Sequence, residues 1–251
     1  MNLTVIILSG ITILIISLLV SGYLQKRAQI LAEKRQKATT HFYQGLNTAK
    51  VLDLLRGVVV PSDIMKYLFN LVETHYKKAK EFWPQYPNID AEIDKIVLRK
   101  ESYKPSQKPK NPVPSDEQKI VAISNRLRKL DKHLRQLAQS AYLPDEQYRA
   151  WHAWLVREVA RIEIDGAIKL AERALEKQAV ATCKTHLGFL AERVAAYEKL
   201  GDDFIAERRK HLDDITHRLE QLIKEIEAKQ KEEVSPTNEE DDPLFGTKKK
   251  W

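Results

Sequence analysis

The stretch IVAISNRLRKLDKHLRQLAQSA, residues 120–141, decides the fold class because its apolar side chains recur in alternating steps of three and four. This spacing is the a/d pattern of a heptad repeat, which places one narrow apolar seam along an α-helix. The seam consists of Ile120, Ile123, Leu127, Leu130, Leu134, Leu137 and Ala141. We therefore expect a helix that packs in a helical hairpin or a coiled coil.

A second seam with the same alternation follows Gly201, and Asp202 or Asp203 marks the start of its helix. Its positions are Leu212, Ile215, Leu219, Leu222 and Ile226. The two seams could pair antiparallel with each other, or one could pair with another chain. Homo-oligomerisation through the seams is therefore one expected mode of association.

The rest of the chain has few turn-forming residues, with 8 glycines and 10 prolines in 251 residues. An all-β domain needs a turn signal every 8 to 12 residues or so, whereas this chain is dominated by Ala, Leu, Glu, Lys, Arg and Gln, which favour helices. The predicted fold class is all-α, with a single N-terminal transmembrane helix followed by a cytoplasmic helical bundle that has long coiled-coil-like helices.

Composition divides the chain into five segments. The boundaries are 1–23 for a transmembrane signal anchor, 24–103 for a juxtamembrane helix and three-helix unit, 104–115 for a Pro/Lys-rich linker, 116–230 for a helical bundle with heptad-like arms, and 231–251 for a disordered charged tail. In segment 24–103 we expect Gly57 to end the first helix, Pro61, Ser62 and Asp63 to start the second, and Asn88 to cap the third.

The anchor is predicted from residues 3–22, LTVIILSGITILIISLLVSG, which contain no ionisable side chain. About 20 apolar residues are long enough to cross the roughly 30 Å hydrocarbon core of a bilayer. Five cations follow within fifteen residues, and basic flanks remain in the cytoplasm. They are Lys26, Arg27, Lys34, Arg35 and Lys37.

This charge pattern predicts one membrane span with the N-terminus outside and the bulk of the chain in the cytoplasm, at the inner membrane if the source is bacterial. A cleaved signal peptide is the alternative, but such a signal normally begins with a basic region, and none precedes this span. The single cysteine, Cys183, cannot form an intramolecular disulfide, which agrees with a reducing compartment.

The most apolar segment lies between the two seams, on a helix expected to start near Pro144 and to break at Gly166 or Gly188. Trp151 and Trp154 are interpreted as core residues in preference to a stacking platform for a ligand. Three acidic residues are interpreted as the solvated side of the same helix, and not as an acid/base pair. They are Glu158, Glu163 and Asp165.

Signatures of catalysis and metal binding are absent from the sequence. It contains no GxxxxGK[ST], GxGxxG, GxSxG or HExxH pattern. Cys183 with His186, and Asp214 with His217, are pairs on one helical face, whereas zinc needs three or four ligands. We therefore predict no enzymatic activity, no cofactor and no metal site.

The basic charge is concentrated in residues 99–135, which hold eleven lysines and arginines against four acidic residues, a surplus equal to the net charge of +7 of the whole chain. These cations could follow nucleic-acid phosphates, lie against anionic lipid headgroups, or form the solvated flanks of the seam. The candidate partner or phosphate contacts are Arg126, Arg128, Lys129, Lys132 and Arg135.

Two further segments have candidate docking features. Leu244, Phe245 and Trp251 are isolated apolar residues in the charged tail, as in short linear docking motifs, and they could equally be inert. Pro109 and Pro112 have PxxP spacing, but the linker is interpreted as a semi-rigid spacer.

These observations predict a membrane-anchored, cytoplasm-facing helical scaffold or adaptor that binds an unidentified protein. The first alternative is a membrane-tethered nucleic-acid-binding protein that uses residues 99–135. The second alternative is an enzyme whose site is assembled from scattered residues, which a deep polar pocket would favour.

Overall fold

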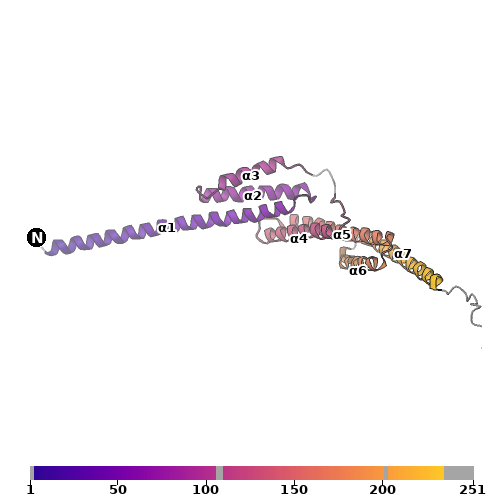
Figure 1. The fold of residues 1–251 in the computed structure, drawn as a ribbon. Helices are drawn as coiled ribbons and strands as arrows, with labels where there is room; N and C mark the ends of the chain where they lie inside the picture. The colour runs from indigo at the N-terminus through magenta and orange to yellow at the C-terminus, as the bar shows by residue number, and fades with distance from the viewer. Residues whose placement is uncertain (1–2, 106–109, 201–202, 235–251) are drawn as a thin grey trace, which may run out of the picture. The chain divides into compact units, whose positions relative to one another are not determined.

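The computed structural model describes residues 3–105, 110–200 and 203–234, and within these ranges it describes no side chain for residues 3–13, 15, 200 and 232–234. Every regular element in the described residues is a helix, and they contain no strand (Figure 1). The α-helices are α1 Leu3–Leu54, α2 Ser62–Phe82, α3 Ile89–Ser102, α4 Glu117–Gln139, α5 Asp145–Glu176, α6 Val180–Ala196 and α7 Asp203–Val234, and a short 3-10 helix, η1, is Glu198–Leu200. The all-α prediction is confirmed.

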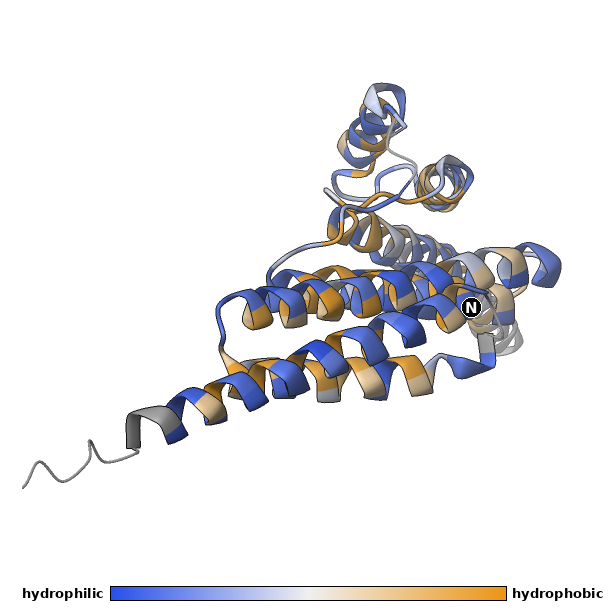
Figure 2. Cartoon of the chain, turned by 90° about the vertical axis from the view of Figure 1, so that its right-hand side faces the viewer, coloured by the Kyte–Doolittle hydropathy of each residue, from blue (hydrophilic) through white to orange (hydrophobic). Residues whose placement is uncertain are grey.

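The helices form two compact units, and each is described by itself. The first unit contains Met1–Asn111 and Lys129–Trp151, and the second contains Pro112–Arg128 and His152–Trp251. Helices α4 and α5 therefore each contribute one part to the first unit and another part to the second. Apolar and polar stripes run along the same helices (Figure 2), as expected for helices that pack on one side.

Helix α1 extends without a break from the predicted anchor into the first unit, and no Gly or Pro lies between residues 23 and 44. Every side chain from residue 16 to residue 37 is exposed, and Ala38 is the first buried one. Beyond Ala38, α2 lies along α1, and α3 lies along α2 (Figure 1). The first unit is therefore built on the part of α1 from Ala38 onward, whereas the side chains described before Ala38 are exposed.

No helix among the residues that the structure describes is long and apolar enough to cross a membrane. Residues 1–2, and the side chains of residues 3–13 and 15, which make up most of the predicted anchor, lie outside that description. The transmembrane anchor therefore gains no support from the structure and stays a prediction.

The predicted helix starts and stops of the first unit are close to the observed ones. Gly57, in the turn after α1, has a φ of 78°, a left-handed conformation that glycine adopts without steric strain. Helix α2 starts at Ser62, as predicted. Asn88 immediately precedes α3, but its side chain makes no capping hydrogen bond, since the residue has a φ of 58°. Asn88 thus caps α3 as predicted, but through its backbone carbonyl, which accepts a hydrogen bond from the N–H of Glu92.

Polar side chains lie inside the first unit where α1, α2 and α4 meet. Nδ1 of His41 is 3.3 Å from Nδ1 of His75, and Oγ1 of Thr48 is 3.1 Å from Nε2 of His133. Burial, with smaller contributions from His41 and Lys78, lowers the pKa of His75 to about 4. His75 is therefore neutral at pH 7, which allows one imidazole of the His41–His75 pair to donate and the other to accept.

The second unit has an apolar core made by α5, α6 and α7. Four α5 alanines at the centre of this core leave room for the larger side chains of α6 and α7. The core also includes Cys183, Leu187, Leu190, Val194, Ile215 and Leu219. Two residues of the second predicted seam, Ile215 and Leu219, thus pack in the same cluster as residues of α5 and α6.

The predicted breaks at Gly166 and Gly188 are wrong, because both glycines lie inside helices. The chain turns instead at residues 177–179, where Gln178 has a φ of 54°. A Cβ at Gly166 would lie 2.5 Å from Cδ1 of Ile120, so this glycine allows α4 to approach α5 closely. Gly166 is thus a packing residue of the second unit and does not end the helix.

The three acidic side chains of α5 that were predicted to be solvated, Glu158, Glu163 and Asp165, are covered, so that interpretation is wrong. Glu163 and Glu158 are buried, and Asp165 is mostly covered. Oε1 of Glu163 is 2.7 Å from Nη2 of Arg128, and Oε2 of Glu163 accepts a hydrogen bond from the hydroxyl of Tyr197. Cationic partners on α4, α5, α6 and α7 compensate the burial of these carboxylates.

Candidate functional site

The described residues of the first unit contain a cavity of about 60 Å³ between α1, α2 and α3. We call it the Tyr76 pocket, because Tyr76 is the residue that α2 contributes. Its lining is apolar at Leu46, Ala49 and Ile96 and charged at Lys50, Asp53, Glu92, Lys95 and Arg99. It is the candidate site of this chain, because apolar and charged side chains of three helices line one hollow of the described residues.

The position of the Tyr76 ring is set by α1. The ring stacks on Phe42 with 5.5 Å between centroids, and Tyr76 is only 1% exposed. Gly45 faces the same ring, and a Cβ at Gly45 would lie 2.6 Å from its Cε1 atom. The absence of a side chain at Gly45 therefore lets the ring pack directly against the α1 backbone.

The hydroxyl of Tyr76 is buried and makes no hydrogen bond within the part of the chain that the structure describes. Burial raises the pKa of Tyr76 to about 12, with further increases from Glu92 and Asp53 and an opposing effect from Arg99. The hydroxyl oxygen itself has almost no accessible surface. It is protonated at neutral pH and can donate a hydrogen bond.

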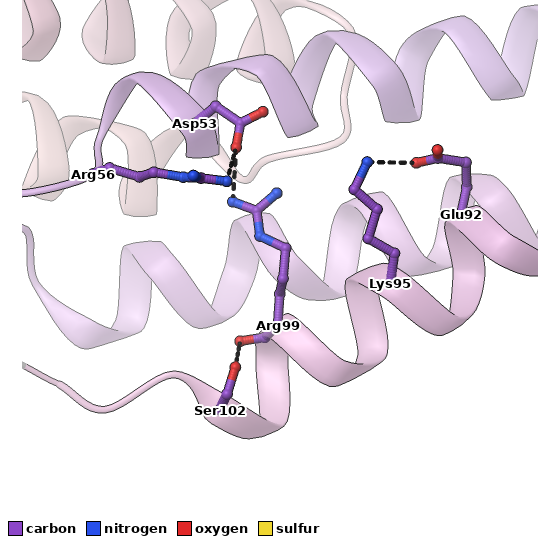
Figure 3. A network of polar contacts seen from close by, with 6 residues as sticks. All are labelled: Asp53, Arg56, Glu92, Lys95, Arg99 and Ser102. Atoms are coloured by element: carbon purple, nitrogen blue, oxygen red, sulfur yellow. Dashed lines mark hydrogen bonds and ion pairs between the residues drawn. The ribbon is translucent and has the colours of Figure 1, made fainter.

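The charged residues at the pocket come from α1 and α3 and are partly paired (Figure 3). Oδ1 of Asp53 lies 3.0 Å from Nη2 of Arg56 and 3.1 Å from Nη2 of Arg99. Nζ of Lys95 lies 3.5 Å from Oε2 of Glu92. Lys50 is exposed and has no ion pair among the described residues. Both carboxylates thus have cationic partners, whereas one of the cations has no carboxylate partner.

The five basic residues predicted as contacts all lie on α4, but the structure divides them between the two units. Arg126 and Arg128 belong to the second unit, and the other three belong to the first. Nη2 of Arg128 binds Glu163 and donates to the Tyr197 hydroxyl at 3.2 Å. Nε of Arg135 donates to the Tyr148 hydroxyl at 3.0 Å. Lys129 and Lys132 are exposed. Two of the predicted contacts therefore have structural roles inside the fold.

The remaining candidates are Trp151, the apolar residues of the tail and the prolines of the linker. Trp151 is buried, and its Nε1 donates to Oδ2 of Asp63 at 2.6 Å, so its interpretation as a core residue is confirmed. Leu244, Phe245, Trp251 and Pro109 lie outside the described residues, as does most of the predicted disordered tail. Within the residues described, no three potential metal ligands lie close enough together to hold an ion.

Sequence reasoning missed the Tyr76 pocket as a site. Its α3 residues, Glu92, Lys95 and Arg99, are spaced i, i+3 and i+7, which puts them on one helical face, and Lys50 and Asp53 have the same relation on α1. That spacing could have shown that each helix has a charged stripe. It could not have shown that the two stripes and a tyrosine of a third helix line one pocket.

Comparison with protein-family models, with curated proteins and with solved structures finds no match to this chain.

Proposed function

We propose that this chain is a membrane-anchored helical scaffold or adaptor whose bulk faces the cytoplasm and binds other proteins. Residues 3–22 would form its single span, with the N-terminus outside and the basic residues after the span on the cytoplasmic side. The helices beyond the span would present the contact surface.

The observation that carries the proposal is the exposure of large apolar side chains on the first part of α1. Between residues 14 and 20, five of them are 51% to 68% exposed, namely Leu14, Ile16, Leu18, Leu19 and Val20. At about 100° per residue these positions point to all sides of the helix. A protein partner covers one face of a helix, whereas lipid covers every face, so an all-round apolar surface favours a membrane span.

Continuity of α1 supports a scaffolding role for the anchor. The exposed apolar segment and the packed segment after Ala38 belong to the same helix. The side chains of Arg35 and Lys37 lie over the rings of Trp83 and Phe82, at 5.0 and 5.9 Å, so the first unit begins about 13 residues beyond the predicted span. At 1.5 Å per residue this spacer holds the unit roughly 20 Å from the hydrocarbon core.

The pairing of basic side chains argues against the nucleic-acid alternative. Within residues 99–135, Arg99 binds Asp53, Lys100 binds Glu73, and Arg128 binds the buried Glu163. Cations that neutralise carboxylates of their own chain contribute less to phosphate binding, and the five predicted contacts on α4 do not all belong to one compact unit. These facts favour a protein-binding scaffold.

Topology is tested with C-terminal fusions to a fluorescent protein and to alkaline phosphatase. We expect fluorescence without phosphatase activity, and phosphatase activity outside the cytoplasm would contradict the proposed orientation. Membrane attachment is tested with the double variant Ile13→Lys/Leu14→Lys, because these positions lie near the middle of the predicted span 3–22, where a lysine opposes insertion by about 2.5 to 3.5 kcal/mol. Leu98→Lys, which changes an exposed leucine of α3, is the matched control and should leave the chain in the membrane fraction.

The protein-binding role is tested by affinity recovery of the full-length chain in detergent across a salt series. An adaptor with an apolar contact should keep its protein partner between about 50 and 200 mM salt. Phosphate binding would weaken by about 10³ to 10⁵ over that range if six to ten phosphates were contacted. If the chain instead recovers nucleic acid that salt removes, and recovers no protein in stoichiometric amount, the nucleic-acid-binding function is favoured.

A further inference from the structure

Helix α1 has a face just beyond the predicted span that no described part of the chain covers. Every side chain from residue 16 to residue 37 is exposed, and four large apolar ones after residue 22 are 45% to 66% exposed. They are Tyr23, Leu24, Ile30 and Leu31. A helix in a protein is normally stabilised by the packing of one face, since an isolated helix of about 12 to 15 residues is only marginally stable in water. Residues 23–37 lack that packing.

The exposed side chains form rows along α1, because residues seven apart lie within about 20° of one another around a helix. Two of the rows are apolar, and at about 100° per residue a basic row lies between them. The six residues, which we call the juxtamembrane face, are Tyr23 and Ile30, Arg27 and Lys34, and Leu24 and Leu31.

The juxtamembrane face is continuous with an interface inside the first unit. Steps of seven residues from Leu31 lead to Ala38 and Gly45, and both are buried. Helix α2 lies along this part of α1 and ends at Phe82, whose ring lies 5.9 Å from Nζ of Lys37 (Figure 1). The side of α1 that binds a helix from Ala38 onward is therefore bare before Ala38.

The charge of this segment determines which partner fits. Residues 23–37 hold five cations and one carboxylate, that of Glu33. Two of the cations, Arg35 and Lys37, lie over aromatic rings of the first unit. Arg27 and Lys34 are exposed and make no ion pair within the residues that the structure describes. A second copy of α1 would bring cations against cations, whereas an acidic helix would complement them.

Distance from the bilayer argues against lipid as the occupant. In a chain anchored as proposed, Ile30 and Lys34 follow the end of the span by 8 and 12 residues, which is roughly 12 and 18 Å of helix. The headgroup layer adds only about 5 to 8 Å to each side of the hydrocarbon core. The part of the face farther from the span therefore lies beyond the headgroups.

We propose that the juxtamembrane face binds an acidic amphipathic helix of a partner protein. The carboxylates of that helix face Arg27 and Lys34, and its apolar side chains pack on the two flanking rows. Residues 23–37 extend over about 22 Å, which is the length of about four helical turns. This inference rests on the proposed adaptor function, because it specifies the kind of protein that the adaptor binds.

Binding is measured by fluorescence anisotropy with the full-length chain in neutral detergent micelles. The probe is a fluorescein-labelled peptide made of two repeats of Leu-Glu-Ala-Leu-Glu-Ala-Glu, and the salt concentration is about 0.15 M, at which charges more than about 8 Å apart are largely screened. We expect saturable binding. Two exposed ion pairs contribute about 2-fold to 30-fold in affinity, so the same peptide with glutamine in place of each glutamate should bind more weakly by about that factor.

The basic row is tested with two double variants that change the net charge of the chain by the same amount. Arg27→Gln/Lys34→Gln should weaken the binding of the glutamate peptide by about 2-fold to 30-fold. Gln29→Glu/Gln36→Glu is the matched control, because these positions lie on the opposite side of α1. The control should bind the glutamate peptide within about twofold of the wild type, since the added charges are screened.

The apolar rows are tested with Leu24→Ser/Leu31→Ser. This variant should weaken the binding of both peptides by at least about tenfold, because a helix packed on the face removes both leucines from water. All the substituted side chains are exposed, so every variant should melt like the wild type by circular dichroism.

The proposal is overturned if the glutamate peptide does not saturate. It is also overturned if the control variant weakens binding as much as the variant of the basic row, which is expected of attraction by net charge alone. A full-length chain that is dimeric by analytical ultracentrifugation, and monomeric when both leucines are replaced by serine, would show that a second copy occupies the face.

Peptide binding in micelles does not depend on insertion into a bilayer. A chain that stays in the membrane fraction but does not bind the peptide would therefore refute only this inference. A chain that binds the peptide but does not enter the membrane would refute the proposed anchor.

Discussion

Replacing Gly45 by alanine tests how tightly α1 and α2 are packed at the Tyr76 pocket. A Cβ at position 45 would lie 2.6 Å from Cε1 and 2.8 Å from Cδ1 of Tyr76, and 3.3 Å from Cβ of His75. Carbon atoms in favourable contact are about 3.5 to 4.0 Å apart, so the ring has to move by about 1 Å. Phe42 stacks on this ring, and Tyr76 is almost fully buried, which leaves little freedom for that movement.

Two opposing effects determine how much Gly45→Ala changes the free energy of unfolding. Overpacking of a core by one methyl group destabilises a protein by about 1 to 3 kcal/mol. Alanine in the middle of a helix, in contrast, is more favourable than glycine by about 1 kcal/mol. We therefore expect Gly45→Ala to lower the free energy of unfolding by up to about 2 kcal/mol. Gly188→Ala is the matched control, since its Cβ would have no neighbour within 4 Å and should stabilise the chain by up to about 1 kcal/mol.

Thermal unfolding followed by far-ultraviolet circular dichroism measures both variants. At roughly 2 to 4 °C per kcal/mol, Gly188→Ala should melt above the wild type and above Gly45→Ala. In the background of Tyr76→Leu, where the ring is removed, Gly45→Ala should become stabilising, because only the helix propensity remains. If Gly45→Ala proves as stable as Gly188→Ala in the wild-type background, the close packing described for Gly45 and Tyr76 is refuted.

The remaining predictions concern buried titratable groups. Because the folded-state pKa of His75 is about 4, below its ordinary value of 6.5, the unfolded chain binds more protons between these values. The contribution of neutral His75 to the free energy of unfolding should be complete above pH 6.5 and lost as the pH falls to about 4. The urea midpoint of His75→Phe should therefore depend less on pH in that range than the urea midpoint of the wild type. Glu163→Gln should lower the free energy of unfolding by about 1 to 3 kcal/mol, because it leaves Arg128 without its buried anionic partner. Glu198→Gln, at an exposed pair with Arg209, should change the free energy of unfolding by less than about 1 kcal/mol, and equal urea midpoints for the two variants would contradict this ranking. Burial raises the pKa of the Cys183 thiol, so a disulfide reagent at pH 7 should label the native chain far more slowly than the urea-unfolded chain, and fast labelling of the native chain would show that the core of the second unit opens.

The sequence was informative where local rules determine the structure. The heptad seam of α4 predicted a helix with buried positions Leu127, Leu130 and Leu134, and all three are buried. The positions of Gly57 and Ser62 predicted the end of α1 and the start of α2 to within a few residues. Caps, breakers and periodicity act within a few residues of one another, so a single sequence contains that information.

Predictions failed where a partner from another helix decides the outcome. Glu163 was assigned to a solvated face because its periodicity is that of a charged flank, but Arg128 and Tyr197 cover it. Gly166 was a candidate break because glycine disfavours helices, yet Ile120 of α4 occupies the space that its missing side chain leaves. The Tyr76 pocket requires three helices to meet, and no local pattern in the sequence states which helices are neighbours.

The uninterrupted course of α1 links the predicted span to the Tyr76 pocket through a fixed angle as well as a fixed length. Each residue of an α-helix adds about 100° of rotation and 1.5 Å of rise. Two residues inserted between positions 24 and 34 would swing Lys50 and Asp53 about 200° around the helix axis while raising them only about 3 Å. Seven inserted residues would return Lys50 and Asp53 to within about 20° of their original angular position around the helix axis and would raise them by roughly 10 Å. In a chain anchored as proposed, the number of residues in α1 would therefore set the direction in which the pocket faces along the membrane surface.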